Sequence, residues 1–336
     1  MAGRPLHESP AMKRALDIFR AVADPTRLRI LALLRAMELS VGELAQVLGQ
    51  SQPRVSRHVR ILADAGLAER RKEGSWVFLG LGPARDMEPL LAAIDAWTAD
   101  EPGDPWAVAD MARLAAVRAD RAAAAEDYFE AHAAEWDAIR SLHVAESEVE
   151  AAIALALGGA PIGRLVDIGT GTGRMIELFG VDAESALGID RSPGMLRMAR
   201  SKLAQAGLTG VELRQGDMYA LPLATGSADV VILHQVLHYA QQPAAAIAEA
   251  ARLLAPGGRL LIVDFAPHDR EELRAGNAHA RLGFADEQIA QWYAAAGLTS
   301  DPPAELRGGE LTVKLWLGHR AAEADEVSPR RRAGAA

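Results

Sequence analysis

The chain contains no cysteine among its 336 residues. This absence excludes disulfide bonds, thiolate metal sites and cysteine nucleophiles, because each of them needs a thiol. Apolar runs are also short, and none approaches the ~20 residues that a membrane-spanning helix requires. The N-terminus "MAGRPLHESPAMKRAL" has no apolar segment of the kind that a secretion signal contains. We therefore expect a globular protein of the cytoplasm, without a membrane partner.

Basic and acidic residues are distributed unevenly along a chain whose net charge is −9. Residues 1–82 hold 13 Lys and Arg against 8 Asp and Glu, a net charge of +5, so the remainder carries −14. Six of these cations lie between Arg54 and Lys72, where the acidic residues are Asp64 and Glu69. A basic stripe in an acidic protein favours a confined contact with a polyanion, although charge alone fits a solvated surface equally well.

The length of the chain and its 50% apolar content predict two packed domains. The stretch "TADEPGDPWAVAD" is dense in Pro, Asp and Gly and marks the break between them. Within it, Asp104 and Pro105 have the order of a helix cap and a first helical turn. We expect a first domain at residues 1–100, a linker helix at 101–125, a second domain at 126–318 and a disordered tail at 319–336.

Two helical patterns open the chain. The first covers residues 12–23, and the second starts at Pro25 and directs Leu28, Leu31 and Leu34 inward. Both are short enough to belong to a small helical domain.

A helix-turn-helix pattern with a β-hairpin follows. In "SVGELAQVLG", Ser40 and Glu43 have capping-box spacing and Gly49 ends the helix. The next stretch, "SQPRVSRHVRILADAG", has an apolar back and a polar front, as a DNA recognition helix requires. The alternation in "LAERRKEGSWVFLGL" reverses at Glu73 and Gly74, which predicts a basic wing.

The polar front of the fourth helix supplies the candidate DNA contacts. Guanidinium groups can bond guanine bidentately and also bind phosphate, so Arg54 and Arg57 are the leading candidates. His58 is equally well explained as a helix-surface histidine. The full predicted set is Gln52, Arg54, Ser56, Arg57, His58 and Arg60 on the helix, with Arg71 and Lys72 on the hairpin.

These motifs resemble the ArsR/SmtB group of winged-helix repressors over residues 11–97. The resemblance implies a homodimer that binds a two-fold DNA operator, with recognition helices roughly 34 Å apart. Many members bind metal through cysteines on the third helix, where this chain reads "ELAQV". Others use histidines on the last helix, and "ARDMEPLLAAIDAW" has none. We therefore expect no metal site.

Beyond residue 160, short apolar runs alternate with helical patterns, which predicts an α/β domain with a mostly parallel sheet. The first run leads into "VDIGTGTGR", where Gly169, Gly171 and Gly173 let the backbone pass close beneath a ligand. A dinucleotide fingerprint would need glycine at position 174, which is Arg174. The expected strands are "RLVDIG", "SALGID", "VELRQG", "ADVVILHQ", "GRLLIVDF" and "TVKLWLG".

Acidic residues stand at the ends of the first three of these strands. The carboxyl edge of a parallel sheet faces the ligand, so we expect Asp167, Asp190 and Asp217 to line a nucleoside site. Asp190 is placed for two ribose hydroxyls, Asp217 for an exocyclic amine with Met218 against the purine, and Asp167 for the amino group of a methionine-like tail.

This series, together with "GIDRSPGMLRMAR" and the long stretch from "SADVVILHQ" to "LLIVDF", resembles the class I S-adenosylmethionine-dependent methyltransferases over residues 126–318. The resemblance implies a Rossmann-like fold, with S-adenosylmethionine or S-adenosylhomocysteine as the ligand. It also implies a lid from Tyr128, Trp136 and Arg140, which are equally well explained as helix core. The predicted ligand set is Asp167, Gly169, Thr170, Gly171, Gly173, Arg174, Asp190, Arg191, Met195, Asp217, Met218, His234 and Gln235.

Four side chains are candidate bases for methyl transfer, namely His234, His238, Asp264 and His268. His268 belongs to a charged segment that fits an acceptor site and a salt-bridged helix surface equally well. The lack of cysteine excludes arsenite methylation and cytosine C5 methylation, both of which use thiols.

Two functions follow. In the first, which we favour, the methyltransferase-like domain of a DNA-binding regulator senses S-adenosylmethionine or S-adenosylhomocysteine. In the alternative, the domain methylates a small metabolite, and the DNA-binding half regulates its own gene.

Overall fold

The computed structural model describes residues 9–73, 76–98, 104–132, 145–158, 160–208, 210–307 and 309–322. The chain forms two compact units. The first consists of Met1–Tyr128, Tyr239–Gln242 and Pro267–Leu282, and the second of Phe129–His238, Pro243–Ala266 and Gly283–Ala336. We call Tyr239–Gln242 and Pro267–Leu282 the inserted segments, because they come from the second half of the sequence and belong to the first unit.

The first unit has the elements of a winged helix. They are α1 (Pro10–Val22), α2 (Pro25–Ala36), β1 (Leu39–Ser40), α3 (Val41–Leu48), α4 (Gln52–Asp64), β2 (Ala68–Glu73), β3 (Trp76–Leu81) and α5 (Ala84–Thr98). The three strands form an antiparallel sheet in the order β1-β3-β2. The predicted helix-turn-helix with a hairpin wing is therefore confirmed.

Local signals fix the ends of α3. The Ser40 side chain accepts from the backbone N–H of Glu43, and the Glu43 side chain accepts from the Ser40 N–H, which completes the predicted capping box. Gly49 ends the helix with a φ of +64°. This left-handed conformation favours glycine, so helix α3 stops where the sequence predicted.

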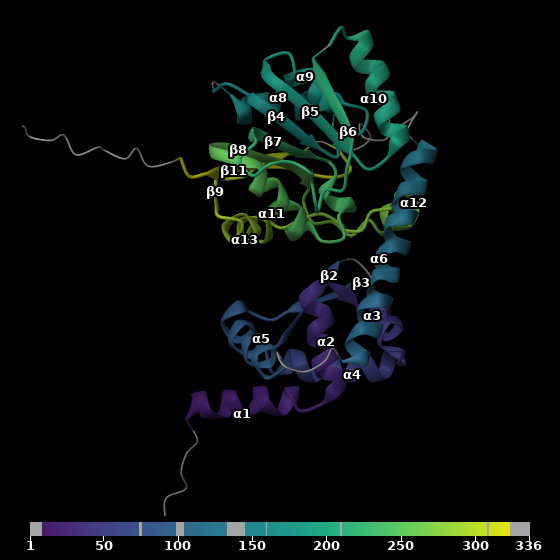
Figure 1. Ribbon diagram of the computed structural model, residues 1–336, viewed down its shortest axis with the longest axis vertical. Coiled ribbons are helices and arrows are strands. Elements are labelled where there is room, and N and C mark those ends of the chain that lie inside the picture. The colour runs from purple at the N-terminus through teal and green to yellow at the C-terminus, as the bar shows by residue number, and fades with distance from the viewer. Residues whose placement is uncertain are drawn as a thin grey trace, which may run out of the picture. The chain divides into compact units, whose positions relative to one another are not determined.

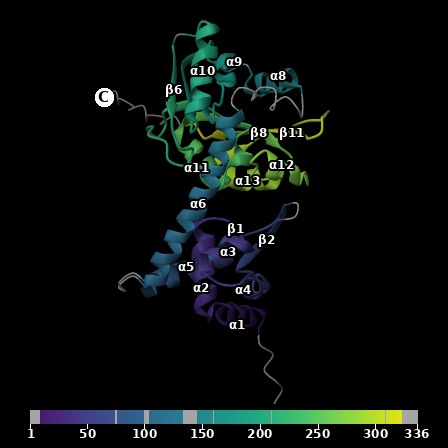
Figure 2. The same ribbon diagram turned by 90° about the vertical axis from the view of Figure 1, so that its right-hand side faces the viewer.

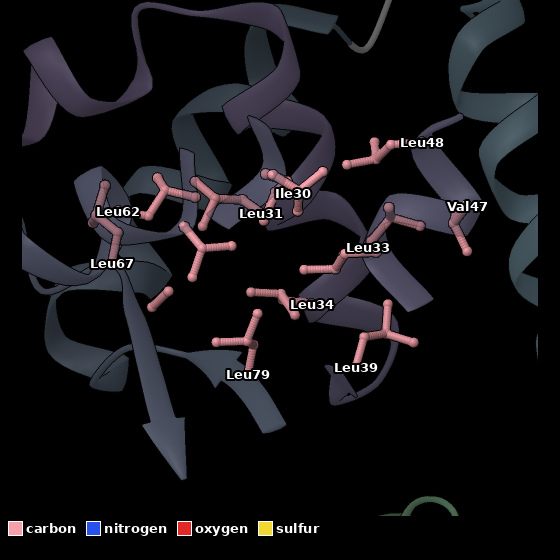
Figure 3. Packing of buried hydrophobic residues seen from close by; sticks show 14 of the residues in the cluster. Ile30, Leu31, Leu33, Leu34, Leu39, Val47, Leu48, Leu62, Leu67 and Leu79 are labelled. Atoms are coloured by element: carbon pink, nitrogen blue, oxygen red, sulfur yellow. The ribbon is translucent and has the colours of Figure 1, made fainter. Parts of the chain in front are cut away.

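The core of the first unit lies between α2, α3, α4 and the wing (Figure 3). Ile30 and Leu31 point into it from α2, with Leu62 from α4 and Leu79 from β3. The inward direction predicted for Leu31 and Leu34 is confirmed, but that for Leu28 is wrong, because Leu28 is 38% exposed. A helical period identifies a face, and it cannot tell how far the neighbouring helices cover that face.

A 28-residue helix, α6 (Pro105–His132), follows, and its N-terminal part belongs to the first unit. Asp104 caps it by accepting from the N–H of Trp106, as predicted. Asp110 is 2% exposed and binds Arg29 of α2 through two hydrogen bonds of 2.6 and 2.7 Å. Burial acts to raise the pKa of Asp110, but hydrogen bonds from Arg29 and Arg113 outweigh it and hold the pKa below its ordinary value.

The boundary between the two units falls inside α6, after Tyr128. The predicted linker helix, residues 101–125, therefore overlaps a helix whose Leu114 and Val117 are part of the first core. Of the predicted lid residues, Trp136 and Arg140 lie outside the described residues, as does the Tyr128 side chain.

The second unit is built on a sheet of eight strands, in the order β10-β11-β8-β7-β4-β5-β6 with β9 beside β11. Its helical elements are α8 (Glu146–Leu157), α9 (Arg174–Phe179), α10 (Pro193–Gln205), η2 (Leu237–Tyr239), α11 (Pro243–Leu253) and α13 (Asp286–Ala295), while α12 (Glu271–Gly276) lies in an inserted segment. The strands are β4 (Gly163–Ile168), β5 (Ala183–Asp190), β6 (Val211–Gln215), β7 (Ala228–His234), β8 (Leu254–Phe265), β9 (Leu298–Ser300), β10 (Ala304–Leu306) and β11 (Val313–Arg320).

Strands β4 to β8 pair in parallel, and β11 pairs antiparallel with β8. Helices α8, α9 and α10 cover one face of this sheet, and α11 and α13 cover the other (Figures 1 and 2). The predicted Rossmann-like, mostly parallel fold and all six predicted strands are confirmed. The sequence did not reveal β9 and β10, which have three residues each.

Two further findings concern the ends and the surface of the chain. Strand β11 runs through Arg320, so the first residues of the predicted tail are part of the sheet, and residues 323–336 lie outside the described part. Among the described helices, none combines the length and the apolar character needed to cross a membrane.

Candidate functional sites

The carboxyl ends of the parallel strands form the candidate ligand site. Gly169 follows β4, Asp190 ends β5, and His234 ends β7. Because β4 lies between β5 and β7 in the sheet, these three strand ends are neighbours along one edge. This edge is where open α/β sheets bind their ligands.

The glycine-rich turn after β4 depends on its glycines. Gly169, Gly171 and Gly173 have φ values of +74°, +52° and +85°, all in the left-handed region that favours glycine. A Cβ atom on Gly169 would lie 2.3 Å from Cγ2 of Val236. The backbone N–H groups of Gly169 and Thr170 donate to the Ile189 carbonyl at 2.7 and 2.9 Å, which fixes the turn against β5.

Asp190 is held beside this turn by backbone donors. Its carboxylate accepts from the N–H of Gly171 at 2.9 Å and from the N–H of Ser192 at 2.8 Å. Burial raises the pKa of Asp190, against the backbone N–H groups of Ser192, Gly171 and Arg191, which lower it. Ser192, which also caps α10, is absent from the predicted ligand set; the signal for it in the sequence is a serine directly before Pro193.

The residues present fit S-adenosylmethionine. An ionised carboxylate has about four acceptor positions. The backbone N–H groups of Gly171, Ser192 and Arg191 use part of this capacity, which leaves Asp190 a position for a ribose hydroxyl. The glycine turn beside it offers backbone without side chains. The resemblance to class I methyltransferases predicts S-adenosylmethionine or its product S-adenosylhomocysteine as this ligand.

The other predicted ligand residues differ in exposure. Asp167, Thr170 and Met195 are buried, at 1%, 5% and 2% exposed. Asp217 is exposed and accepts from the backbone N–H of Tyr219 at 3.1 Å, with Met218 half-buried beside it. Their contacts with a ligand stay predictions.

Two predicted arginines have contacts that tie elements together. Arg174 bonds to Glu150 of α8 at 2.7 and 3.0 Å and to Glu177 at 2.7 Å. The backbone carbonyl of Arg191 accepts from the side chain of Gln215 at 3.0 Å. Arg174 thus joins α8 to α9, and the ligand role of both arginines stays a prediction.

The turn after β7 contains a strained residue. Gln235 has a φ of +48°, which is uncommon for a residue with a side chain, and its N–H donates to the Val263 carbonyl at 2.7 Å. Gln235 and His234 are both 9% exposed. Such backbone strain costs about 1–3 kcal/mol and is concentrated at ligand sites. It therefore supports a ligand role for this turn.

A buried histidine–aspartate pair lies next along the chain. Nδ1 of His238, in η2, is 2.8 Å from Oδ1 of Asp264 at the end of β8. Asp264 also accepts from the backbone N–H groups of His238 at 3.1 Å and Phe265 at 2.8 Å. A carboxylate only accepts, so Nδ1 of His238 carries the proton and Nε2 is the basic nitrogen.

The fourth candidate base is in a different unit. His268 belongs to an inserted segment, whereas His234, His238 and Asp264 belong to the second unit. Nδ1 of His268 accepts from the backbone N–H of Arg270 at 3.3 Å. The structure therefore brings His238 and Asp264 together, and the catalytic role of His268 stays a prediction.

The predicted DNA face occupies one side of α4. Val55, Val59 and Leu62 are fully buried, which leaves the polar side of the helix outward. The exposed members of the predicted set are Gln52, Arg54, Arg57, Arg60 and, on the wing, Lys72, whereas Ser56, His58 and Arg71 are half-buried.

Two of the half-buried residues have partners within the first unit. Nδ1 of His58 is 3.6 Å from the carboxylate of Asp24, and burial lowers the pKa of His58. Arg71 binds Glu38 at 2.5 Å. A DNA contact by either side chain stays a prediction. No group of three or more His, Asp or Glu that could hold a metal ion occurs in the described part of the chain.

Comparison with known proteins identifies both halves. Residues 24–70 match the family model described as bacterial regulatory protein, arsR family, and residues 166–262 match the model described as methyltransferase domain. The arsenical resistance operon repressor of Escherichia coli is 38% identical over 99 residues, which is 29% of this chain and 85% of the repressor. The chain belongs to the arsR family of bacterial regulatory proteins.

This ArsR-family protein also carries a methyltransferase domain. The malonyl-(acyl-carrier protein) O-methyltransferase of Methylococcus capsulatus is 34% identical over 149 residues, 42% of this chain and 54% of that enzyme. The chain therefore spans about half the length of this curated methyltransferase. The solved structure of YcgJ from Bacillus subtilis aligns with 52% of this chain and 99% of its own, at 19% identity and a TM-score of 0.47.

Proposed function

We propose that this protein is a cytoplasmic transcriptional regulator that binds operator DNA through α4 and the wing. Its methyltransferase domain binds S-adenosylmethionine or S-adenosylhomocysteine as a signal. The exposed guanidinium groups of Arg54, Arg57 and Arg60 are suited to phosphate and base contacts. The half-buried carboxylate of Asp190 beside the glycine turn is suited to the ligand's ribose.

The inserted segments carry the sensor proposal. One begins directly after His238, which follows β7, and the other begins at Pro267, two residues after the end of β8. Both therefore leave the carboxyl edge of the sheet and fold into the unit that contains α4. Signalling requires only that the ligand prefer one arrangement of the regulator, and a ~100-fold preference corresponds to ~2.7 kcal/mol.

Fluorescence anisotropy on the protein's own upstream DNA tests this function. The DNA binding curve is measured alone, with S-adenosylmethionine and with S-adenosylhomocysteine. We expect at least one ligand to shift the Kd for DNA. Ligand binding by calorimetry together with an unshifted DNA curve would reject the sensor.

The His238 and Asp264 pair favours a second function, methyl transfer to a small metabolite. S-adenosylmethionine supplies a methyl group on a sulfonium sulfur. Asp264 would hold the His238 ring in the tautomer whose Nε2 accepts a proton from the acceptor group. We rank this function second because His238 is 2% exposed and Asp264 is fully buried, so the ring offers an acceptor little surface.

Turnover of labelled S-adenosylmethionine with candidate metabolites tests the second function. An enzyme should lose kcat in a His238→Gln variant while its Kd for S-adenosylhomocysteine stays unchanged. Activity that survives this variant would remove His238 from the reaction.

We also propose that the regulator is a homodimer. Several apolar side chains of the first unit are exposed, namely Met12, Phe19, Trp97, Trp106, Val108 and Met111. They lie on α1, on α5 and at the start of α6, and a second copy of the chain would bury them. Sedimentation velocity should give a dimer, and a monomer at micromolar concentration would contradict this assignment.

A further inference from the structure

Three arginines and one glutamate surround Phe78 in the first unit. We call Glu38, Arg71, Phe78, Arg274 and Arg281 the Phe78 cluster. Glu38 directly precedes β1, Arg71 is in β2, and Phe78 is in β3, while Arg274 and Arg281 come from the inserted segment Pro267–Leu282. The cluster therefore joins the wing sheet to a segment that starts at the carboxyl edge of the methyltransferase sheet.

Arg281 is the centre of the cluster and is 1% exposed. Its Nη1 lies 2.8 Å from Oε2 of Glu38, and its Cζ lies 4.5 Å from the centre of the Phe78 ring. Its Nη2 donates to the backbone carbonyl of Gln241, in the other inserted segment, at 3.0 Å. A buried guanidinium is stable only where its charge and donors are matched, so these contacts define one specific position for Arg281.

Glu38 and Phe78, which contact Arg281, also contact Arg71 of the wing. Arg71 pairs with Phe78 across the two strands of the hairpin, binds Glu38 at 2.5 Å and lies 5.9 Å from the Phe78 ring. Arg274 lies 5.5 Å from that ring. A displacement of Arg281 therefore changes the surroundings of Glu38 and Phe78, which position Arg71 and the hairpin.

On its other side, the cluster is connected to the ligand edge through the chain itself. Gln241 lies three residues after His238, whose ring and backbone N–H are both held by Asp264. Tyr239 contacts His279 edge to face, with ring centres 5.3 Å apart, which links the two inserted segments. The segment after β7 is therefore in direct contact with Arg281 and with the other inserted segment.

We propose that the Phe78 cluster couples ligand binding at the methyltransferase sheet to the wing, an inference that rests on the proposed sensor function. Ligand at the turns after β4 and β7 biases the position of residues 239–242, and Arg281 passes this bias to Glu38 and Phe78. The cluster is the element with two arrangements that such coupling requires. The competing explanation is that Arg281 only packs the first unit.

Arg281→Met separates the two explanations. Methionine keeps much of the apolar stem and removes the charge and the planar donors. Arg270→Met is the matched control, because Arg270 lies in the same segment and its ion pair is with Glu272. Three quantities are measured for each protein: the Kd for S-adenosylhomocysteine by calorimetry, and the Kd for DNA with and without that ligand.

We expect the ligand to change the Kd for DNA by about tenfold in the wild type and in Arg270→Met. In Arg281→Met the two DNA values should become equal, while the Kd for S-adenosylhomocysteine without DNA stays at the wild-type value. Amide exchange of residues 68–81 should then respond to the ligand in the wild type and not in the variant.

Other outcomes separate this inference from the proposed function. A folded Arg281→Met that binds ligand and keeps the wild-type DNA response would overturn the coupling role and leave the sensor intact. A wild type whose DNA affinity ignores the ligand would overturn both. If Arg281→Met does not fold, Glu38→Gln provides the same test, because it removes the charge and keeps the side-chain shape.

Discussion

The DNA face on α4 consists of side chains, whereas the candidate ligand site at the carboxyl edge of the sheet depends on backbone groups. On α4, Arg54, Arg57 and Arg60 are exposed side chains on a helix whose position depends on buried valines. At the ligand edge, Gly171 contributes backbone in a left-handed conformation, and Asp190 is fixed by backbone donors. A face made of side chains should weaken gradually under substitution, whereas a site made of backbone should fail at a single position.

Gly169→Ala gives the strongest test of this contrast. The substitution forces alanine into the left-handed conformation and also places its Cβ against Val236. Because both effects destabilise the folded state, the free energy of unfolding should fall by roughly 2–5 kcal/mol. Gly207→Ala is the control, because Gly207 has the same φ of about +75° and no atom within 4 Å of the added Cβ. It should lose about 1–2 kcal/mol. Equal losses in urea unfolding would contradict the proposed close approach at Gly169.

Asp190→Asn tests the ligand carboxylate. Hydrogen bonds to a charged group contribute about 1.5–3 kcal/mol, so the Kd for S-adenosylhomocysteine should rise about 10- to 100-fold in calorimetry. The exposed surface variant Asp182→Asn should bind as the wild type does. An unchanged Kd in Asp190→Asn would remove Asp190 from the site.

Arg57→Ala should weaken DNA binding by about tenfold and reduce the slope of log K against log salt by about 1. The loss is limited because Arg54 and Arg60 remain on the same exposed side of α4. Arg307→Ala, an exposed arginine of the second unit, serves as the control in the gel-shift titration. A gel shift that is identical in all three proteins would refute α4 as the recognition helix.

The smallest effect concerns pH. Burial raises the pKa of Asp190 above its ordinary value of 3.8, and ribose hydroxyls favour the ionised carboxylate. The cost of the buried charge is present at neutral pH and disappears as the pH falls through the raised pKa, while ligand affinity falls in the same window. The increase in Tm caused by S-adenosylhomocysteine should therefore shrink on acidification. The same series with Asp190→Asn should not show this trend.

Local signals made much of this structure predictable. The capping box of Ser40 and Glu43 and the glycines at 169 and 173 act within a few residues, so the sequence displays them directly. The Asp190 position followed from strand register alone. Ion pairs between residues far apart in the chain have no comparable signal in the sequence.

The clearest example of a distant pair is Arg281 with Glu38. Each looks like an ordinary surface charge in the sequence, and their partnership arises only because Pro267–Leu282 folds into the first unit. The charged segment that contains His268 has members in different surroundings for the same reason. Arg270 and Glu272 pair on the short helix α12 and its flank, while Arg281 is buried beside Phe78. A sequence pattern shows which residues are charged, whereas their burial depends on which distant segments pack against them.

The position of the unit boundary within α6 has a consequence for the history of this gene. In a fusion of two independent domains, a stop codon in the linker leaves the first domain intact. Here a chain ending at His132 would lack both inserted segments, and with them Arg274 and Arg281, two of the three arginines beside the Phe78 ring. Since the first unit is completed by residues 239–242 and 267–282, shortening the gene after α6 removes part of the DNA-binding unit as well as the methyltransferase domain.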